Sequence, residues 1–153
     1  MRTLALSAAL LLYAATLHGQ YSTGTKPSKL TWGPAPAAFP AGAKMAVVEG
    51  DPGKAAQFTV ELSFPDGYRI RPHFHPTAET VTVKKGSFLV GMGDTFDLAK
   101  TQVLKVGGKG SIAANEHHYA AAKGTTVVDV SAMGPFAMTY VNPADDPRPP
   151  ANQ

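Results

Sequence analysis

Two histidines and a glutamate lie close together in the middle of the chain and carry side chains that bind transition metals. His73 and His75 are two residues apart, and Glu79 follows four residues later. In an extended strand the side chains at positions i and i+2 lie on the same face, so the two imidazoles point the same way. Glu79 shares that face if the strand continues to it. Two imidazoles and a carboxylate on one face predict a metal site that needs a further ligand.

The further ligand is expected from two adjacent histidines downstream, His117 and His118. The chain has five histidines, and the remaining one, His18, lies in an N-terminal apolar segment. Neighbouring side chains on a strand face opposite sides, so only one of the adjacent pair can join His73 and His75 without distortion. The pattern of residues alone leaves open which one it is.

The spacing of these residues resembles the first motif of the cupin superfamily, G-x5-HxH-x3-E-x6-G. Every fixed position of the motif is matched, by Gly67, His73, His75, Glu79 and Gly86. Five fixed positions at set spacings make the match specific, and the resemblance extends over residues 44–142. It implies a metal-binding barrel with a single ion inside.

A second cupin motif, G-x5-PxG-x2-H-x3-N, is kept only in part. His118 and the following Tyr119 match the pair of a histidine and an aromatic residue that the family places here, whereas Gly108 lies one residue out of register. The resemblance therefore implies His118 as the fourth metal ligand. The usual proline, glycine and asparagine of the motif are replaced by Ala113, Asn115 and Ala122.

Short β-strands are favoured along most of the chain. Apolar and polar residues alternate strictly from Phe58 to Phe64, which is typical of a half-buried strand. Thr125–Ala132 is the most β-prone run, and Lys84–Gly86 predicts a turn. About eight such strands with turn signals between them, and no convincing helix, predict a closed all-β architecture. This agrees with the single cupin double-stranded β-helix, or jelly-roll barrel, that the resemblance implies.

Four segments are predicted along the 153 residues, which fit one domain. Residues 1–19 combine an arginine, an apolar run and small residues, which predicts a secretory signal peptide and a periplasmic or secreted protein. An uncleaved anchor and a buried helix are the alternatives for this segment. Residues 20–43 are rich in proline and predict an extended N-terminal arm. Residues 44–142 form the barrel, and residues 143–153 an irregular tail.

Composition excludes several kinds of cross-link, metal ligand and binding partner. The chain has no cysteine, so disulfides and thiolate ligands are excluded. Its 14 lysines and arginines are scattered, and with 11 acidic residues the formal charge is only +3. Without a stripe of basic and aromatic residues, nucleic acid is not expected as a partner, and no membrane is expected after removal of the leader. The resemblance implies a homodimer, in which the N-terminal arm could be exchanged.

Three neutral imidazoles and one carboxylate accept several divalent transition metals, so the ligands alone leave the metal open. A six-coordinate ion would keep two open positions. An exported chain meets its metal outside the cytoplasm, where the order of binding strength favours copper and then zinc. We therefore expect one divalent ion per chain, copper by preference, with zinc, manganese or iron as alternatives.

Two classes of function fit this site. The first is a metal-dependent oxidoreductase that uses O2 or peroxide on a small molecule, a carbohydrate polymer or plant-derived material. The second is a non-catalytic cupin that binds or senses a metal or ligand. On alternation Arg71 faces the same way as His73, so it is predicted to hold an anionic substrate, unless it is a rim residue paired with an acid. Glu116 shares the face of His118 and is the nearest candidate acid–base group.

Overall fold

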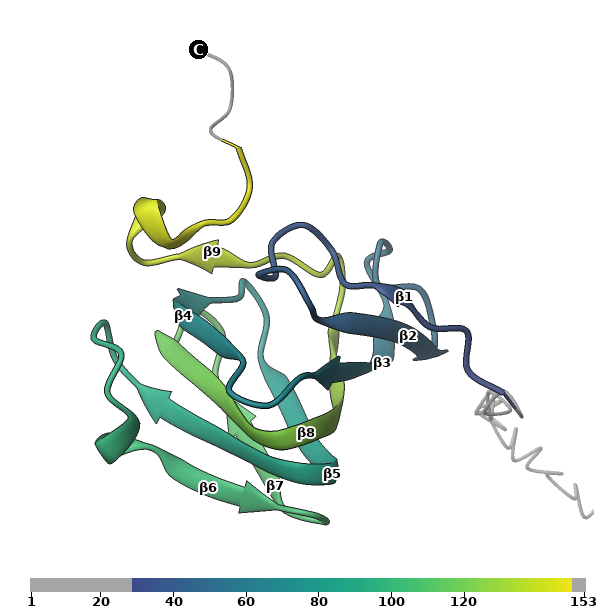
Figure 1. Cartoon of the computed structure of the whole chain (residues 1–153). Helices are drawn as coiled ribbons and strands as arrows, with labels where there is room; N and C mark the ends of the chain where they lie inside the picture. The colour runs from purple at the N-terminus through teal and green to yellow at the C-terminus, as the bar shows by residue number, and fades with distance from the viewer. Residues whose placement is uncertain (1–28, 150–153) are drawn as a thin grey trace, which may run out of the picture.

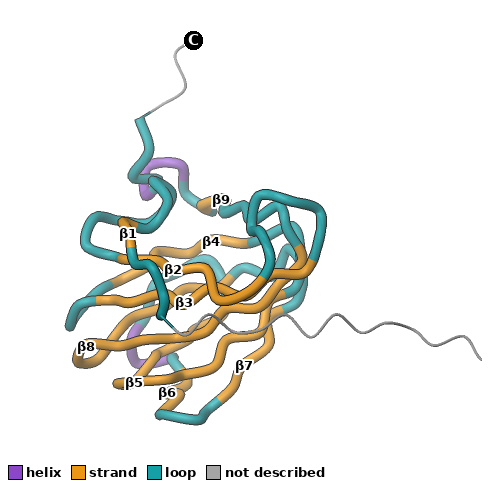
Figure 2. Tube along the Cα trace, turned by 90° about the vertical axis from the view of Figure 1, so that its right-hand side faces the viewer, coloured by secondary structure: helices purple, strands orange, loops and turns teal. Residues whose placement is uncertain are grey.

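The computed structural model describes residues 29–149 and shows a curled antiparallel β-sheet (Figures 1 and 2). Within these residues the only helices are two short 3-10 helices, and neither is long or apolar enough to cross a membrane. The predicted all-β class is confirmed. In chain order the elements are β1 (Gly33–Pro34), β2 (Lys44–Glu49), β3 (Gln57–Phe64), β4 (Arg69–Phe74), β5 (Glu79–Met92), η1 (Leu98–Lys100), β6 (Gln102–Lys105), β7 (Lys109–Ile112), β8 (His118–Met133), β9 (Thr139–Tyr140) and η2 (Pro143–Asp145).

Strands β5 and β8 organise the barrel because each is long enough to belong to two layers. They pair with each other along most of their length. The first half of β5 also pairs with β7 and its second half with β6, while β8 pairs first with β4 and then with β3. The result is two facing sheets, one ordered β1-β2-β3-β8-β5-β7 and the other β9-β4-β8-β5-β6. This arrangement is the predicted jelly roll.

The two layers are joined where β5 and β8 bend. The register of β5 on β8 shifts on both sides of Lys85, and Gly86 adopts a φ of 73°, which favours glycine. A Cβ at Gly86 would also lie 2.6 Å from the carbonyl oxygen of Thr125. The predicted turn at Lys84–Gly86 is therefore wrong: a bulge carries the strand around the corner instead of reversing it.

The core lies between the facing sheets. In β3 the side chains of Phe58, Val60, Leu62 and Phe64 are buried and alternate with half-buried polar residues, as the sequence predicts. The ring of Phe64 stacks on that of Phe88 from the other sheet, with 5.8 Å between ring centres. Apolar side chains of both layers therefore interdigitate and exclude water from the barrel.

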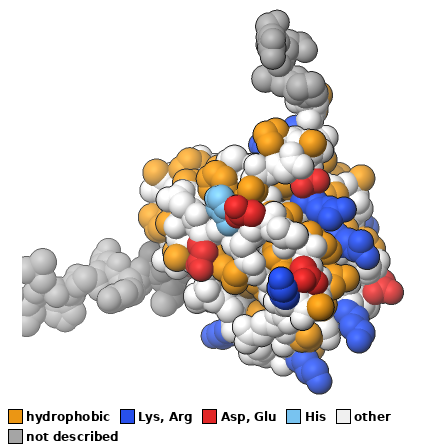
Figure 3. Space-filling model, turned by 90° about the vertical axis from the view of Figure 1, so that its left-hand side faces the viewer, with side chains coloured by type: hydrophobic (Ala, Val, Ile, Leu, Met, Phe, Trp, Pro, Cys, Tyr) orange, Lys and Arg blue, Asp and Glu red, His pale blue; other side chains and the backbone are white. Residues whose placement is uncertain are grey.

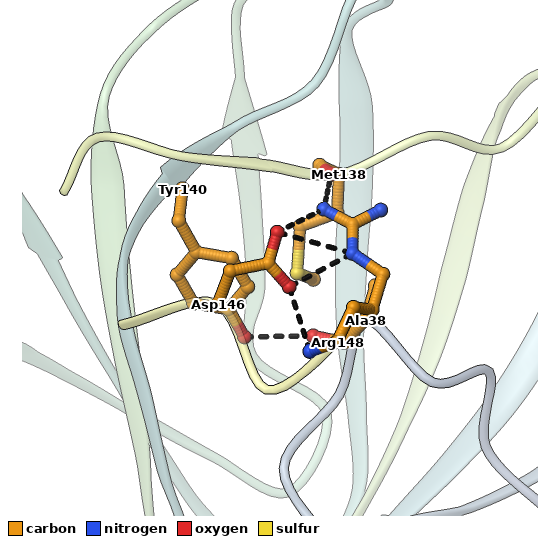
Figure 4. Close-up of polar contacts among 5 residues, drawn as sticks. All are labelled: Ala38, Met138, Tyr140, Asp146 and Arg148. Carbon is orange, nitrogen blue, oxygen red and sulfur yellow. Dashed lines mark hydrogen bonds and ion pairs between the residues drawn. The ribbon is translucent and has the colours of Figure 1, made fainter. Parts of the chain in front are cut away.

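The described part of the N-terminal arm, residues 29–43, packs on the barrel. Phe39 is buried, and its ring stacks on that of Phe136 at 6.1 Å between centres. The hydroxyl of Tyr140 donates a hydrogen bond of 2.7 Å to the carbonyl oxygen of Ala38 (Figure 4). The arm is thus an integral part of the folded domain.

The tail is also fastened to the barrel as far as it is described. Arg148 forms an ion pair with Asp146 and donates a hydrogen bond of 3.1 Å to the carbonyl oxygen of Met138 (Figure 4). The tail therefore has one helical turn, η2, and a fixed side-chain contact where the sequence predicts irregular chain. The predicted signal peptide (residues 1–19), the start of the arm and residues 150–153 lie outside the described residues.

Replacing Gly91 by alanine is expected to destabilise the fold. Gly91 pairs with Tyr119, whose buried ring would be overlapped by a Cβ at position 91, and the Tyr119 hydroxyl donates to the carbonyl oxygen of Asp97 at 2.9 Å. Overpacking of this kind costs about 1–3 kcal/mol. Urea unfolding of Gly91→Ala should show a loss of that size. Gly33→Ala is the control, because nothing lies within 4 Å of its added Cβ. Equal stabilities of the two variants would contradict the expectation.

Candidate metal centre

Three buried histidines converge between the two sheets. His73 comes from β4, His75 from the turn after β4, and His118 is the first residue of β8. Each side chain offers a ring nitrogen, and these three nitrogens lie within 4.8 Å of one another. All three residues are at most 5% exposed. On the face shown in Figure 3, histidine reaches the surface only in one small area, beside an acidic side chain.

A bulge in β4 brings His73 to this point. The pairing of β4 with β8 shifts between Ile70 and His73, so both side chains face the interior although they are three residues apart. His73 then lies directly opposite His118 on the neighbouring strand. Paired residues of adjacent strands project to the same side of a sheet, which places the two imidazoles together, with 4.2 Å between ring centres.

Each imidazole is held by a hydrogen bond from its Nδ1 atom to a backbone carbonyl oxygen. A carbonyl oxygen can only accept, so each Nδ1 carries the proton, and in the neutral ring Nε2 keeps a free lone pair. This is the arrangement that orients metal-binding histidines. The three distances are 2.8 Å from His73 to Arg71, 2.7 Å from His75 to Ala137 and 2.9 Å from His118 to Glu116.

Glu79 approaches the histidines from the opposite sheet. It is the first residue of β5, pairs with Ile112 of β7 and is 8% exposed. Its two carboxylate oxygens lie 3.6 Å from Nε2 of His75 and 3.4 Å from Nε2 of His118. One carboxylate thus contacts two of the three free ring nitrogens, at distances longer than a well-formed hydrogen bond.

The protonation states favour a bound cation. Burial lowers the pKa of His73 well below its usual value, and the neighbouring His118 and His75 lower it further. Burial by itself would raise the pKa of Glu79, but its interactions with His118 and His75 outweigh this and lower the pKa. At neutral pH His73 is therefore a neutral ligand beside an ionised carboxylate, as metal binding requires.

The three histidines and Glu79 line an internal cavity of about 30 Å³. Every other side chain that lines it is apolar, among them Val81, Val90, Ile112, Phe136 and Met138. A donor set of three nitrogens and one oxygen in such a space fits a single transition-metal ion. The structure thus brings together the four residues that the sequence assigns to the metal, and their binding of an ion stays a prediction.

Arg71 points away from the metal centre. Its side chain is exposed, and its guanidinium lies 5.0 Å from the centre of the Phe96 ring, a cation–π contact. The bulge between Ile70 and His73 reverses the alternation on which the prediction depended. The prediction that Arg71 faces the same way as His73 is therefore wrong, and only its backbone carbonyl contacts the site.

The side chain of Glu116 is exposed as well. It accepts a hydrogen bond of 3.0 Å from the backbone N–H of Ala113 and so closes the turn before β8. The alternation argument fails here because Glu116 precedes the strand, which begins at His118. Neither Glu116 nor Arg71 lines the cavity. Their predicted catalytic roles are untested and have no support in this geometry.

Of the two adjacent histidines, His118 joins the cluster and His117 does not. The side chain of His117 is 38% exposed, and its Nδ1 lies 2.6 Å from a carboxylate oxygen of Asp94. Its ring stacks on Phe74 at 5.0 Å between centres. The choice of His118 that the resemblance implied agrees with this placement.

The departures of the second motif have a local explanation. Asn115 replaces the usual glycine and has a φ of 61°, the only positive φ of a non-glycine residue in the described part of the chain. Asparagine adopts this left-handed conformation more readily than most residues, so the turn is preserved. The first glycine of the motif is Gly107, with a φ of 83°, rather than Gly108.

Two contributors to the site were missed from the sequence. The carbonyl oxygen of Ala137 holds His75, and the ring of Phe136 stacks on that of His75 at 5.4 Å between centres. A backbone carbonyl leaves no signal in the residue type. The sequence predicts Phe136 as an apolar residue of the last strand, but β9 begins only at Thr139. Nothing in the pattern links Phe136 to a histidine 61 positions away.

Comparisons with known proteins bear on the fold. No protein-family model matches the chain, and no curated protein matches it in sequence. Solved structures do resemble it. One is a cupin superfamily protein from Desulfitobacterium hafniense, with 13% identity and a TM-score of 0.51 over 61% of this chain and 78% of that one.

Two further structures match over nearly the whole chain. A proposed acetylacetone dioxygenase from Methylibium petroleiphilum has 19% identity and a TM-score of 0.59, and the match covers 94% of this chain and 90% of that one. An oxalate oxidase has 18% identity and a TM-score of 0.53, with 90% of this chain and 72% of that one covered. The chain therefore has the fold of the cupin superfamily, as its first motif implied.

Proposed function

We propose that this protein is a metal-dependent oxidoreductase that uses O2 or peroxide to oxidise a small molecule with oxygen donor atoms. The observation that carries the proposal is the group of three carbonyl-held imidazoles beside Glu79, facing an apolar cavity. A redox-active ion bound there would supply Lewis acidity and electron exchange with the oxidant.

The residues of the chain have separate tasks in this proposal. His73, His75 and His118 hold the ion through their Nε2 atoms, and their Nδ1 bonds prevent the rings from turning. The carboxylate of Glu79 offsets part of the positive charge. It is also the one carboxylate that lines the cavity, so it is the candidate to accept a proton from a substrate. The apolar wall excludes water and strengthens these charge interactions.

The size of the cavity favours a small substrate over a polymer. A space of about 30 Å³ bounded by apolar side chains holds an ion and little more, so any substrate has to displace part of the apolar wall, and a polysaccharide chain would have to displace most of it. The names of two structural neighbours, an acetylacetone dioxygenase and an oxalate oxidase, describe oxidation of small oxygen-bearing molecules. We therefore infer that the substrate is a small diketone, carboxylate or related compound rather than a carbohydrate polymer.

Copper is the metal that we infer first. An exported chain takes its metal where binding strength decides occupancy, and copper binds nitrogen and oxygen ligands most strongly. Copper also exchanges electrons, which zinc does not. Export stays part of the proposal, and the predicted signal peptide, residues 1–19, lies outside the described residues. A homodimer also stays part of the proposal.

His73→Ala is expected to abolish both metal binding and oxidation. The change removes one of three imidazoles and leaves only two rings beside Glu79. The matched control is His117→Ala, which removes an adjacent histidine that lies outside the cluster. Metal content by mass spectrometry should fall to background in His73→Ala and stay at one ion per chain in the control. Activity that survives in metal-free His73→Ala would place the chemistry elsewhere.

Stability of the metal-free protein is expected to fall as the pH falls below about 6.5. The pKa of His73 is lower in the folded protein than in the unfolded chain. As the pH falls, the unfolded chain therefore binds a proton first, which stabilises the unfolded state and lowers the free energy of unfolding. The contribution of His73 to folding stability is complete above its pKa in the unfolded chain. It is lost as the pH falls toward its pKa in the folded protein, at up to about 1.4 kcal/mol per pH unit for one group.

Denaturant unfolding between pH 7 and about pH 5 measures this dependence. His73→Asn removes the titrating group and should flatten the profile. Equal slopes in the two proteins would show that His73 has no part in the effect.

Binding without turnover is the second candidate function. The observation that favours it is the burial of all four predicted ligands, each at most 8% exposed. An oxygen electrode separates the two functions. Copper-loaded protein mixed with pentane-2,4-dione or oxalate should consume O2, and His73→Ala should not. A protein that binds copper and either compound but consumes no oxidant would be a binding or sensing cupin.

A further inference from the structure

A second hollow, of about 250 Å³, lies on the side of the barrel between β6 and β7. Both strands pair with β5, β7 with its first half and β6 with its second half, and no pairing joins β6 to β7 in the described sheet. The sheet therefore leaves a seam at this edge. We call the hollow in the seam the side vestibule; its outer part is lined by the exposed residues Met92, Lys100, Gln102 and Ser111.

The side vestibule and the metal cavity share a wall. Val81, Val90 and Ile112 line both spaces. A residue that lines two hollows separates them with its own side chain, so one layer of aliphatic groups lies between solvent and the metal centre here. Opening this layer takes a change of χ1 at one or more of these β-branched side chains and breaks no side-chain hydrogen bond.

The strand register shows which ligands lie behind this wall. Ile112 pairs with Glu79, and Met92 pairs with His118. Since paired residues project to the same face, the side vestibule ends beside the two ligands whose carboxylate oxygen and Nε2 lie 3.4 Å apart. A hollow on the other side of the centre shares Phe136 and Met138 with the metal cavity, but there the wall is aromatic and packed: Phe136 stacks on His75, and Phe39 stacks on Phe136.

The lining defines the class of molecule that fits. The floor is aliphatic, whereas the outer part carries the Lys100 ammonium and the Gln102 amide. Lys100 is 81% exposed and only 3.7 Å from Asp97, a surface pair that contributes little and leaves the ammonium free to turn. A small molecule with an apolar body and one anionic or carbonyl group would meet both surfaces.

We propose that the side vestibule is the entrance through which such a small oxygen-bearing molecule reaches the metal centre, past Ile112 and Met92. The inference rests on the proposed function for the presence of a metal, but not on turnover. It assigns selection of the substrate to β6, β7 and the end of β5, which supply none of the histidine ligands.

Two tryptophan variants of β6 test the entrance. Gln102 pairs with Val90 and shares its face, so Gln102→Trp would fill the side vestibule. Val103 is the next residue, faces the opposite side and is 49% exposed, so Val103→Trp is the matched control. Both positions are exposed, and both variants are expected to fold.

The probe is pentane-2,4-dione, whose binding to cobalt-loaded protein is followed by visible absorption in a stopped-flow instrument. Its association rate should fall at least about tenfold in Gln102→Trp and stay within about twofold in Val103→Trp, with metal content unchanged in both. Equal rates in all three proteins would overturn the proposal, as would unmodified protein that never binds the probe at its metal.

A third variant covers the case in which Gln102→Trp also lowers metal content. Gln102→Ala widens the entrance and should raise the association rate; an unchanged rate then overturns the proposal. Binding and turnover fail separately. If probe binding depends on Gln102 but no O2 is consumed, the proposed entrance is supported and the proposed oxidoreductase activity is contradicted. O2 consumption that is indifferent to Gln102→Trp would do the reverse.

Discussion

The candidate site depends on three hydrogen bonds from imidazole Nδ1 atoms to backbone carbonyl oxygens. They fix which nitrogen of each ring is free, and so determine that His73, His75 and His118 present a metal-binding face at all. The three carbonyls belong to a bulge in β4, to the turn before β8 and to the segment before β9. No local stretch of the chain could supply all three, so the site requires the closed barrel.

Burial makes these four side chains costly without an ion. An ionised carboxylate between two sheets loses its hydration, and the Nε2 atoms 3.4 and 3.6 Å from its oxygens offer it lone pairs and no N–H donor. The apolar core around them gains stability from the same exclusion of water. The fold therefore keeps an incompletely compensated negative charge at one end of an apolar interior, and a bound cation would compensate it.

The sequence predicted the candidate ligand residues better than the backbone that positions them. Spacing and the cupin resemblance identified the four converging residues, and alternation in Phe58–Phe64 identified a strand. The bulge before His73 was not predictable, because an extra backbone residue leaves no pattern in side-chain types. The placement of Arg71 was wrong for the same reason. Strand β7 (Lys109–Ile112) was missed because four residues with a glycine and a lysine show no apolar alternation.

The segments outside the barrel strands take part in holding the centre. His75 depends on the carbonyl of Ala137, which lies in a stretch without long strand pairing. On one side of it Arg148 holds the carbonyl of Met138 (Figure 4). On the other side Phe39 of the arm stacks on Phe136. Arm and tail thus fix the backbone that orients one ring, so a composition rich in proline and poor in pattern still carries information for the metal centre.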